Sequence, residues 1–178
     1  MPNNRVTGSV FDQFEQMGEG RGFHANLSDM LEGSDMLRDF SRQDIEQIAH
    51  YVSAYEAPKG TVVLREGEKQ SYMFILSSGR LDVFKSADNV SAGEKPKKIA
   101  TIRQGKSVGE MSLLDGLGHS ATAVAAEPVE MLLVTKSQFD QLLEAHPVIG
   151  VKLLRRIAAL MSLRLRQTSG ILIDYLKK

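Results

Sequence analysis

The spacing of hydrophobic positions changes twice along this chain of 178 residues. Between residues 27 and 57 the spacing is helical, which predicts N-terminal helices. Residues 58–136 instead hold short apolar runs separated by turn residues, a pattern typical of strands. Residues 137–178 return to helical spacing, so the chain is expected to end in helices. Residues 1–26 are polar and dotted with glycine, and we expect a flexible N-terminal arm there.

Six apolar runs follow one another in the middle of the chain without helices between them. They cover residues 62–64, 73–76, 81–84, 98–102, 121–125 and 129–134. Close spacing favours antiparallel pairing, so the expected fold class is α+β. The strands would form a small barrel or sandwich. Gly67 and Gly79 are expected in tight turns that need a positive φ.

Two of the expected helices have recognisable start signals. Ser41 with Asp44 resembles a capping box, in which each side chain bonds the backbone of the other residue. Ser137 is expected to cap a short helix over residues 138–145, which a His-Pro pair then ends.

The C-terminal helix, expected over residues 148–176, has a regular seam. Its positions alternate in steps of 3 and 4, the spacing of a coiled coil. The seam consists of Val151, Leu154, Ala158, Met161, Leu165, Thr168, Leu172 and Tyr175. We therefore expect a parallel homodimer through this helix, while Ile157, Leu160 and Ile171, which lie off the seam, would pack inward. The alternative is a helix that packs only on its own roll.

Composition narrows the possible chemistry. Lys plus Arg and Asp plus Glu both number 22, so no net charge favours nucleic acid or an acidic membrane. The absence of cysteine excludes disulfides, thiolate metal sites and cysteine nucleophiles. The four histidines lack metal-ligand spacing, and neither a nucleophile elbow nor a Gly-Lys-Ser phosphate loop occurs. No apolar run reaches membrane-spanning length. We expect neither an enzyme nor a metal site nor a membrane protein, and a cytoplasmic location.

Residues 107–124 contain the candidate binding site. Strand-like ends flank a short helical turn that begins at Gly109, and a glycine-bracketed loop follows. A strand that breaks into a helix at a glycine presents backbone N–H groups, which attract phosphate. Glu110 would repel a bare phosphate, but its carboxylate would accept hydrogen bonds from sugar hydroxyls. The expected ligand therefore offers both groups.

This stretch resembles the phosphate-binding cassette of cyclic nucleotide-binding domains. In that family a Gly-Glu pair opens a short helix, and the Glu takes the ribose 2′-hydroxyl. An Arg followed by Ser, Thr or Ala takes the cyclic phosphate together with backbone N–H groups. Gly109 and Glu110 match this pattern, as do Ser120 and Ala121, whereas His119 stands at the arginine position.

His119 leaves three interpretations open. It acts as a weaker phosphate donor when protonated near its ordinary pKa of about 6.5, or it marks a pocket for a different ligand, or the pocket is degenerate and empty. Loss of the charged two-pronged contact would weaken binding by about 2–3 kcal/mol. Arg103 and Lys106 lie just upstream as possible substitutes.

The resemblance also implies a contact from the C-terminal helix. Residues 164–169 resemble the dimer helix of bacterial cyclic AMP-responsive activators, in which a Thr-Ser pair reaches the adenine amino group. Thr168 and Ser169 are therefore candidates for contacting the base, and the alternative is seam polarity that sets the dimer register. The candidate ligand-binding residues are Gly109, Glu110, Met111, Ser112, His119, Ser120, Ala121, Thr168 and Ser169.

The resemblance covers roughly residues 39–176. It implies an antiparallel β-roll, a jelly-roll-like double-stranded barrel, flanked by N-terminal helices and a long C-terminal helix. It also implies a regulatory module. It would bind a cyclic nucleotide, with cyclic AMP favoured, and signal through closure of the C-terminal helix, without a further cofactor. The activators continue with a helix-turn-helix, whereas this sequence ends at Lys178. We therefore expect no DNA binding, and an output through dimer contacts, the arm or an effector protein. The competing hypothesis is a degenerate fold that serves as a protein–protein interaction module without nucleotide.

Overall fold

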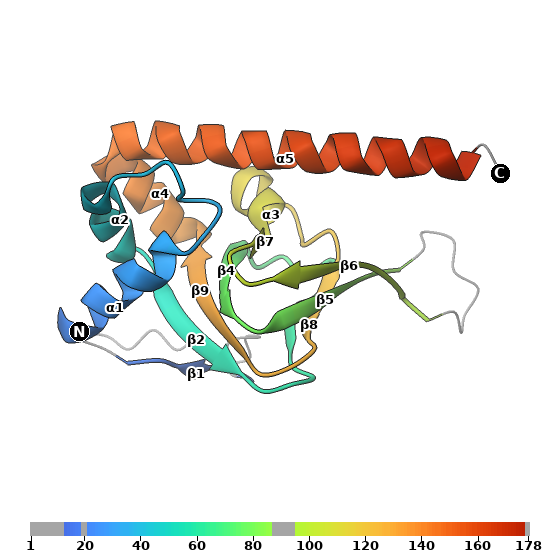
Figure 1. Cartoon of the computed structure of the whole chain (residues 1–178), viewed down its shortest axis with the longest axis horizontal. Coiled ribbons are helices and arrows are strands. Elements are labelled where there is room, and N and C mark those ends of the chain that lie inside the picture. The colour runs from blue at the N-terminus through green and yellow to red at the C-terminus, as the bar shows by residue number, and fades with distance from the viewer. Residues whose placement is uncertain (1–12, 19–20, 87–94, 177–178) are drawn as a thin grey trace.

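Two antiparallel sheets form the centre of the molecule (Figure 1). The computed structural model describes residues 13–18, 21–86 and 95–176. Within them, one sheet has the strand order β1-β2-β9-β4-β7 and the other β3-β8-β5-β6. The strands are β1 (Glu15–Gln16), β2 (Ser53–Ala57), β3 (Val62–Leu64), β4 (Tyr72–Ser78), β5 (Arg80–Lys85), β6 (Lys97–Arg103), β7 (Ser107–Val108), β8 (Thr122–Ala125) and β9 (Val129–Thr135).

The inner faces of the two sheets share one hydrophobic cluster. Its members include Phe74 of β4, Leu81 of β5 and Met131 of β9, all fully buried. Among the described strands, none of the first sheet pairs with one of the second, so the sheets do not close into a barrel. The predicted α+β fold with an antiparallel β-roll is confirmed, as a two-sheet roll that stays open.

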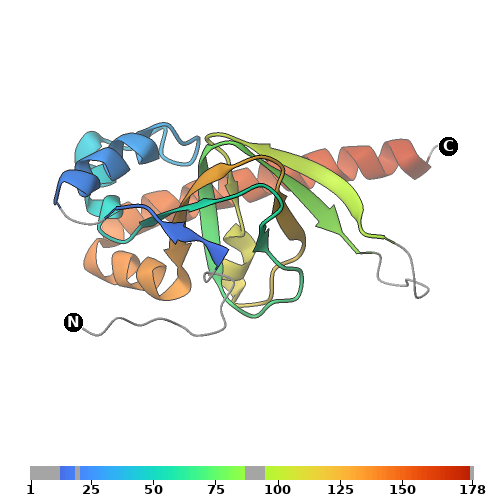
Figure 2. The same ribbon diagram turned by 90° about the horizontal axis from the view of Figure 1, so that it is seen from below.

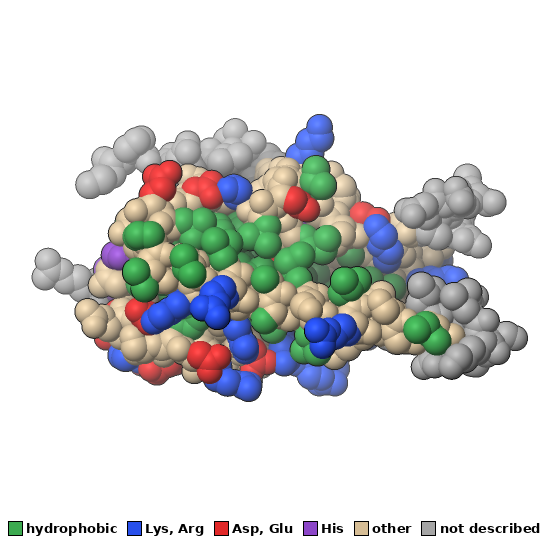
Figure 3. All heavy atoms as spheres, turned by 90° about the horizontal axis from the view of Figure 1, so that it is seen from above, with side chains coloured by type: hydrophobic (Ala, Val, Ile, Leu, Met, Phe, Trp, Pro, Cys, Tyr) green, Lys and Arg blue, Asp and Glu red, His purple; other side chains and the backbone are tan. Residues whose placement is uncertain are grey.

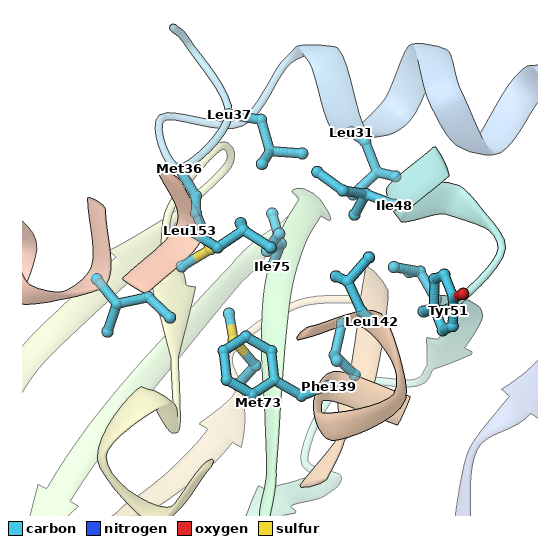
Figure 4. A pocket seen from close by; sticks show the side chains of 13 residues that line it. Leu31, Met36, Leu37, Ile48, Tyr51, Met73, Ile75, Phe139, Leu142 and Leu153 are labelled. Atoms are coloured by element: carbon cyan, nitrogen blue, oxygen red, sulfur yellow. The ribbon is translucent and has the colours of Figure 1, made fainter. Parts of the chain in front are cut away.

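Helices α1, α2 and α4 and the start of α5 gather at one end of the sheets (Figure 2). The described helices are α1 (Arg21–Glu32), α2 (Arg42–Ala49), α3 (Glu110–Asp115), α4 (Lys136–Ala145) and α5 (Pro147–Leu176). Side chains from α1, α2, α4 and α5 build a second hydrophobic cluster against the first sheet. Figure 4 shows a cavity inside this cluster, between residues such as Leu31, Phe139 and Leu153. Its volume of about 20 Å³ is far too small for a nucleotide.

The long helix α5 lies across the helical end and continues over α3 (Figure 1). Ile149, Leu153 and Ile157 are buried against the second cluster. Two cations on the same face add polar contacts. Lys152 Nζ lies 2.7 Å from Asp44 of α2, and Arg156 donates two hydrogen bonds to the carbonyl of Asp35, at 3.1 and 2.6 Å.

The expectation of two faces on α5 holds for the residues described. Ile157 packs inward, and Leu160 packs partly against the core. Val151 and Leu165 of the seam are exposed, whereas Met161 is partly covered by the core. The side chains of Ile171, Leu172 and Tyr175 lie outside the described part. Nothing in these contacts tests the dimer, which stays a prediction.

The prediction of helix throughout residues 27–57 is wrong at its end. Helix α2 stops at Ala49, and the next segment forms β2, which pairs with β9 from Ser53 opposite Leu133 to Ala57 opposite Val129. Val52 fitted the helical stripe by spacing alone. The pairing with β9 satisfies the backbone of this segment in a strand, so tertiary context overrides the local pattern.

The expected flexible arm is also partly wrong. Phe14 is buried and packs edge-on against Phe74, with ring centroids 5.7 Å apart. Strand β1 pairs with β2, and α1 begins at Arg21. Residues 1–12 and 19–20 of the predicted arm lie outside the described residues.

The cap predictions have mixed outcomes. Ser41 and Asp44 form the expected capping box at the start of α2. Ser137 is not the cap of α4, because Thr135 and Gln138 form a reciprocal capping box two residues earlier. The turn glycines have the predicted positive φ, at 76° for Gly67 and 82° for Gly79. No described helix is long and apolar enough to cross a bilayer.

Candidate functional site

The candidate site begins where β7 turns into α3. Gly109 joins the two elements with φ of 93°, in the left-handed region. A Cβ atom there would lie 2.7 Å from the carbonyl oxygen of Tyr72, so only glycine fits this junction. The predicted sequence of strand, short helix and loop over residues 107–124 is therefore present, and it rests directly on β4.

Glu110 points into the protein and is only 2% exposed. Arg164 of α5 binds its carboxylate with both terminal nitrogens, at 2.9 Å to Oε2 and 3.0 Å to Oε1. The same guanidinium donates to the carbonyl of Ser107 at 2.7 Å, and the Ser107 hydroxyl also donates to Oε1. A buried carboxylate is costly without such partners. The acid of the cassette is thus ordered by α5.

His119 is also buried, at 4% exposed. Its Nδ1 atom lies 3.1 Å from the Ser112 hydroxyl, and its ring packs edge-on against Tyr72 with centroids 4.6 Å apart. Its Nε2 atom is buried and makes no hydrogen bond of normal geometry. Burial lowers the pKa of His119 below its ordinary value, and the backbone of Gln70 opposes this shift only in part. The imidazole is therefore held neutral at pH 7.

The remaining cassette candidates fall into two groups. Ser112 is buried, with its hydroxyl 3.0 Å from the carbonyl of Gly109, so it ties the helix start together. Met111 and Ser120 are exposed, and Ala121 is partly buried. The structure therefore places the Ser120–Ala121 end of the cassette where a ligand can reach it.

Thr168 and Ser169 lie on the exposed part of α5. Their hydroxyls donate to carbonyls of their own helix, Arg164 and Leu165, both at 2.9 Å. These bonds hold both hydroxyls against α5 itself and not against the cassette. They lie about one helical turn beyond Arg164, the residue that does reach it.

The two cations considered as substitutes for an arginine do not face the cassette end. Lys106 pairs with Asp35, in the loop between α1 and α2. Arg103 is exposed and lies opposite Arg80 in the pairing of β5 with β6.

Sequence reasoning missed Arg164 and Ser107. Ser107 precedes Glu110 by three residues, but its hydroxyl bonds the Glu110 side chain and Gly109 is the N-cap, so the capping-box pattern does not identify it. Arg164 belongs to the segment compared with the activators' dimer helix, one turn before Thr168, but its partner becomes evident only once α5 crosses α3. Within the described residues, no group of three or more potential ligands is placed to hold a metal ion.

A sequence model of the family described as "Cyclic nucleotide-binding domain" matches residues 55–146, more than half of the chain. The chain belongs to the cyclic nucleotide-binding domain family. The match runs from within β2 through α4 and therefore contains the whole cassette.

Individual relatives agree with this assignment. The Cyclic AMP receptor protein of Thermus thermophilus is 26% identical over 137 residues, which make up 77% of this chain and 60% of that protein. The chain thus spans about 60% of this curated relative. A solved cyclic nucleotide-binding domain from Methylobacillus flagellatus KT has a TM-score of 0.79 at 24% identity, covering 94% and 92% of the two chains.

A more distant structure shares the fold. The regulatory domain of Toxoplasma gondii PKA, solved with cAMP, has a TM-score of 0.62 at 16% identity. The alignment covers 76% of this chain and 50% of that one.

The neutral, buried His119 makes stability depend on pH. Because its pKa is lowered in the folded state, the unfolded chain takes up the proton first as pH falls through about 6.5. The resulting loss of unfolding free energy is absent above a pH of about 6.5. It grows below that pH, by at most about 1.4 kcal/mol per pH unit. We expect His119→Gln to lose less unfolding free energy than the wild type between pH 7.5 and 5.5 in urea titrations. An identical loss in both proteins would contradict a neutral His119.

Proposed function

We propose that this domain is a non-enzymatic sensor that binds a cyclic nucleotide, with cyclic AMP favoured, at the cassette. The observation that carries the proposal is the buried Glu110 at the family's Gly-Glu position, fixed by Arg164 from α5. The name of the Thermus relative supports cyclic AMP as the ligand.

The Glu110 carboxylate retains hydrogen-bonding capacity for a ribose hydroxyl. A carboxylate offers about four acceptor positions. Oε1 already accepts from Ser107 and Arg164, whereas Oε2 accepts one bond from Arg164. One acceptor position on Oε2 is not used by these bonds, so the ion pair and a ribose hydroxyl could share the carboxylate once neighbouring groups move to expose it. The cyclic phosphate would then lie toward Ser120 and Ala121, and the base toward Thr168 and Ser169.

The proposed output passes through α5. Glu110 would contact both the ligand and Arg164, so binding at the cassette alters the charge and hydrogen bonding that α5 experiences. A ligand shifts a conformational equilibrium only through such differential contacts. In this mechanism the ligand stabilises one position of α5, and a partner subunit or an effector protein responds to it.

The proposed homodimer uses the exposed seam of α5. Figure 3 shows hydrophobic side chains gathered on the face that carries this helix. The exposed seam residues are Val151, Leu154 and Leu165. Burial of such a band against a second copy would remove apolar surface from water.

The second candidate function is an interaction module that binds no nucleotide. The observation in its favour is His119, whose buried, neutral ring supplies no charge to a phosphate. The exposed seam of α5 would then be the surface that binds a partner protein.

Calorimetry separates the two candidates. We expect cyclic AMP to bind the wild type more tightly than cyclic GMP, and Glu110→Gln to weaken binding at least tenfold, because a hydrogen bond to a charged group is worth about 1.5–3 kcal/mol. The control Glu144→Gln changes an exposed carboxylate on α4 and should bind normally. Absence of binding to the wild type at millimolar nucleotide would overturn the sensor and favour the interaction module.

Hydrogen exchange tests the coupling to α5. Cyclic AMP should slow exchange along α5 in the wild type but not in Arg164→Ala, which loses both bonds to Glu110. The variant should also lose about 1–3 kcal/mol of unfolding free energy. Arg166→Ala, at an exposed position two residues further on, is the control and should retain the response. Equal protection of α5 in Arg164→Ala would exclude this route.

Sedimentation tests the dimer. Leu165→Glu places a charge on the seam and should yield monomers, because a buried unpaired charge is strongly unfavourable at an interface. Leu163→Glu is the matched control, since Leu163 is similarly exposed, at 53% against 69%, but lies off the seam. Dimers that persist in Leu165→Glu, or monomers in both variants, would count against the seam.

A further inference from the structure

The cassette lacks a cation at the position where the family has an arginine. A cyclic phosphate keeps its negative charge, and charge-assisted hydrogen bonds are the strong ones for such a group. His119 is neutral and its ring faces the core, and Lys106 is committed to Asp35. A cation on another part of the chain is therefore a candidate to bind the phosphate.

Strand β5 brings Lys85 to this place. Side chains alternate along a strand, so Lys85 is on the same face as the buried Leu81 and Val83, which is the face toward the roll. The pairing of β5 with β8 sets Phe84 opposite Thr122, which leaves Lys85 next to the end of the cassette. Its Nζ atom lies 2.8 Å from the carbonyl oxygen of Ser120.

Glu66 holds Lys85 in that position. Its Oε1 atom lies 2.6 Å from Nζ, and its Oε2 atom accepts from the backbone N–H of Ser86 at 3.1 Å. The backbone N–H of Glu66 donates to the Thr122 hydroxyl at 3.1 Å, so the acid itself is anchored to β8. The Lys85 side chain stays 40% exposed, and the site is therefore accessible from solvent.

The ammonium group has capacity for one more partner. It carries three N–H donors, of which Glu66 and the Ser120 carbonyl take two. The third remains for an anion next to Ser120 and Ala121. A lysine is a mobile point charge on a flexible chain, so it can turn toward a phosphate that settles beside it.

We propose that Lys85 is the cation that binds the cyclic phosphate in this domain, and that Glu66 positions it. This inference rests on the proposed function and names the specificity residue for the charged part of the ligand. Glu66 also competes with the phosphate for the ammonium group. The Glu66 carboxylate therefore lowers the affinity, so a higher nucleotide concentration is needed for half-occupancy.

Calorimetry with cyclic AMP and with adenosine, its uncharged relative, tests the role of Lys85. Lys85→Gln should weaken cyclic AMP at least tenfold and leave adenosine unchanged, and Lys85→Arg should restore cyclic AMP to within about threefold of the wild type. The control Lys98→Gln removes a lysine of β6 that pairs with Asp82 and should bind both ligands normally.

Two further measurements distinguish the charge of Lys85 from a structural role of this residue. Glu66→Gln keeps an acceptor for Ser86 but releases Lys85, so cyclic AMP should bind several-fold more tightly. Affinity should be the same at pH 6 and pH 8, because this mode of phosphate binding does not depend on protonation of His119.

The outcomes are distinguishable. Equal cyclic AMP affinity in Lys85→Gln and the wild type overturns the inference and leaves the sensor intact. A parallel loss of adenosine binding shows a structural role and also overturns it, as does tighter binding at pH 6 that disappears in His119→Gln. If the wild type binds neither cyclic AMP nor cyclic GMP, the proposed function fails and this inference fails with it.

Discussion

A carboxylate that is removed from water must be given a partner, and in this protein the partner comes from the last helix. Glu110 is almost fully buried, and two nitrogens of Arg164 bind its two oxygens. Arg164 is itself 44% exposed, so the main cost of losing it is a buried carboxylate left without its charged partner. The Glu110 carboxylate needs a charged partner. This need fixes the start of α3 and the end of β7 against the middle of α5.

Regularly spaced basic side chains also hold α5 in position. Lys152, Arg156 and Arg164 are separated by four and eight residues, so they lie on one side of the helix. They reach Asp44 in α2, the Asp35 carbonyl in the loop before it, and Glu110 in the cassette. Between them the buried Leu153 and Ile157 anchor the helix to the core. One helix is thereby tied to the N-terminal helices and to the candidate site.

Much of this fold could be predicted from the sequence, because strands and helices differ in hydrophobic period. The six central runs all became strands, and the Gly-Glu pair correctly located the start of α3. The error at β2 has a physical cause: Val52 continued a helical stripe by coincidence, and only the partner strand β9 shows otherwise. The burial of Phe14 was equally hidden, since it depends on contact with the distant Phe74.

The chemistry of the site was less accessible than its location. Glu110 and His119 could be selected by type and spacing, yet their burial and partners depend on how α5 and β4 cross the cassette. Lys85 lies 35 residues before Ser120, and no local pattern joins them. Long-range pairing of β5 with β8 creates that neighbourhood.

The length of α5 beyond Arg164 has a mechanical consequence. Residues 165–176 continue the helix to its end at Leu176, and positions 165–170 and 173 are exposed. At 1.5 Å per residue this portion measures about 18 Å, so a tilt of about 10° at Arg164 would move its tip by about 3 Å. In the proposed mechanism the helix would therefore act as a lever, in which a small change near the Glu110 carboxylate becomes a larger displacement at Leu176.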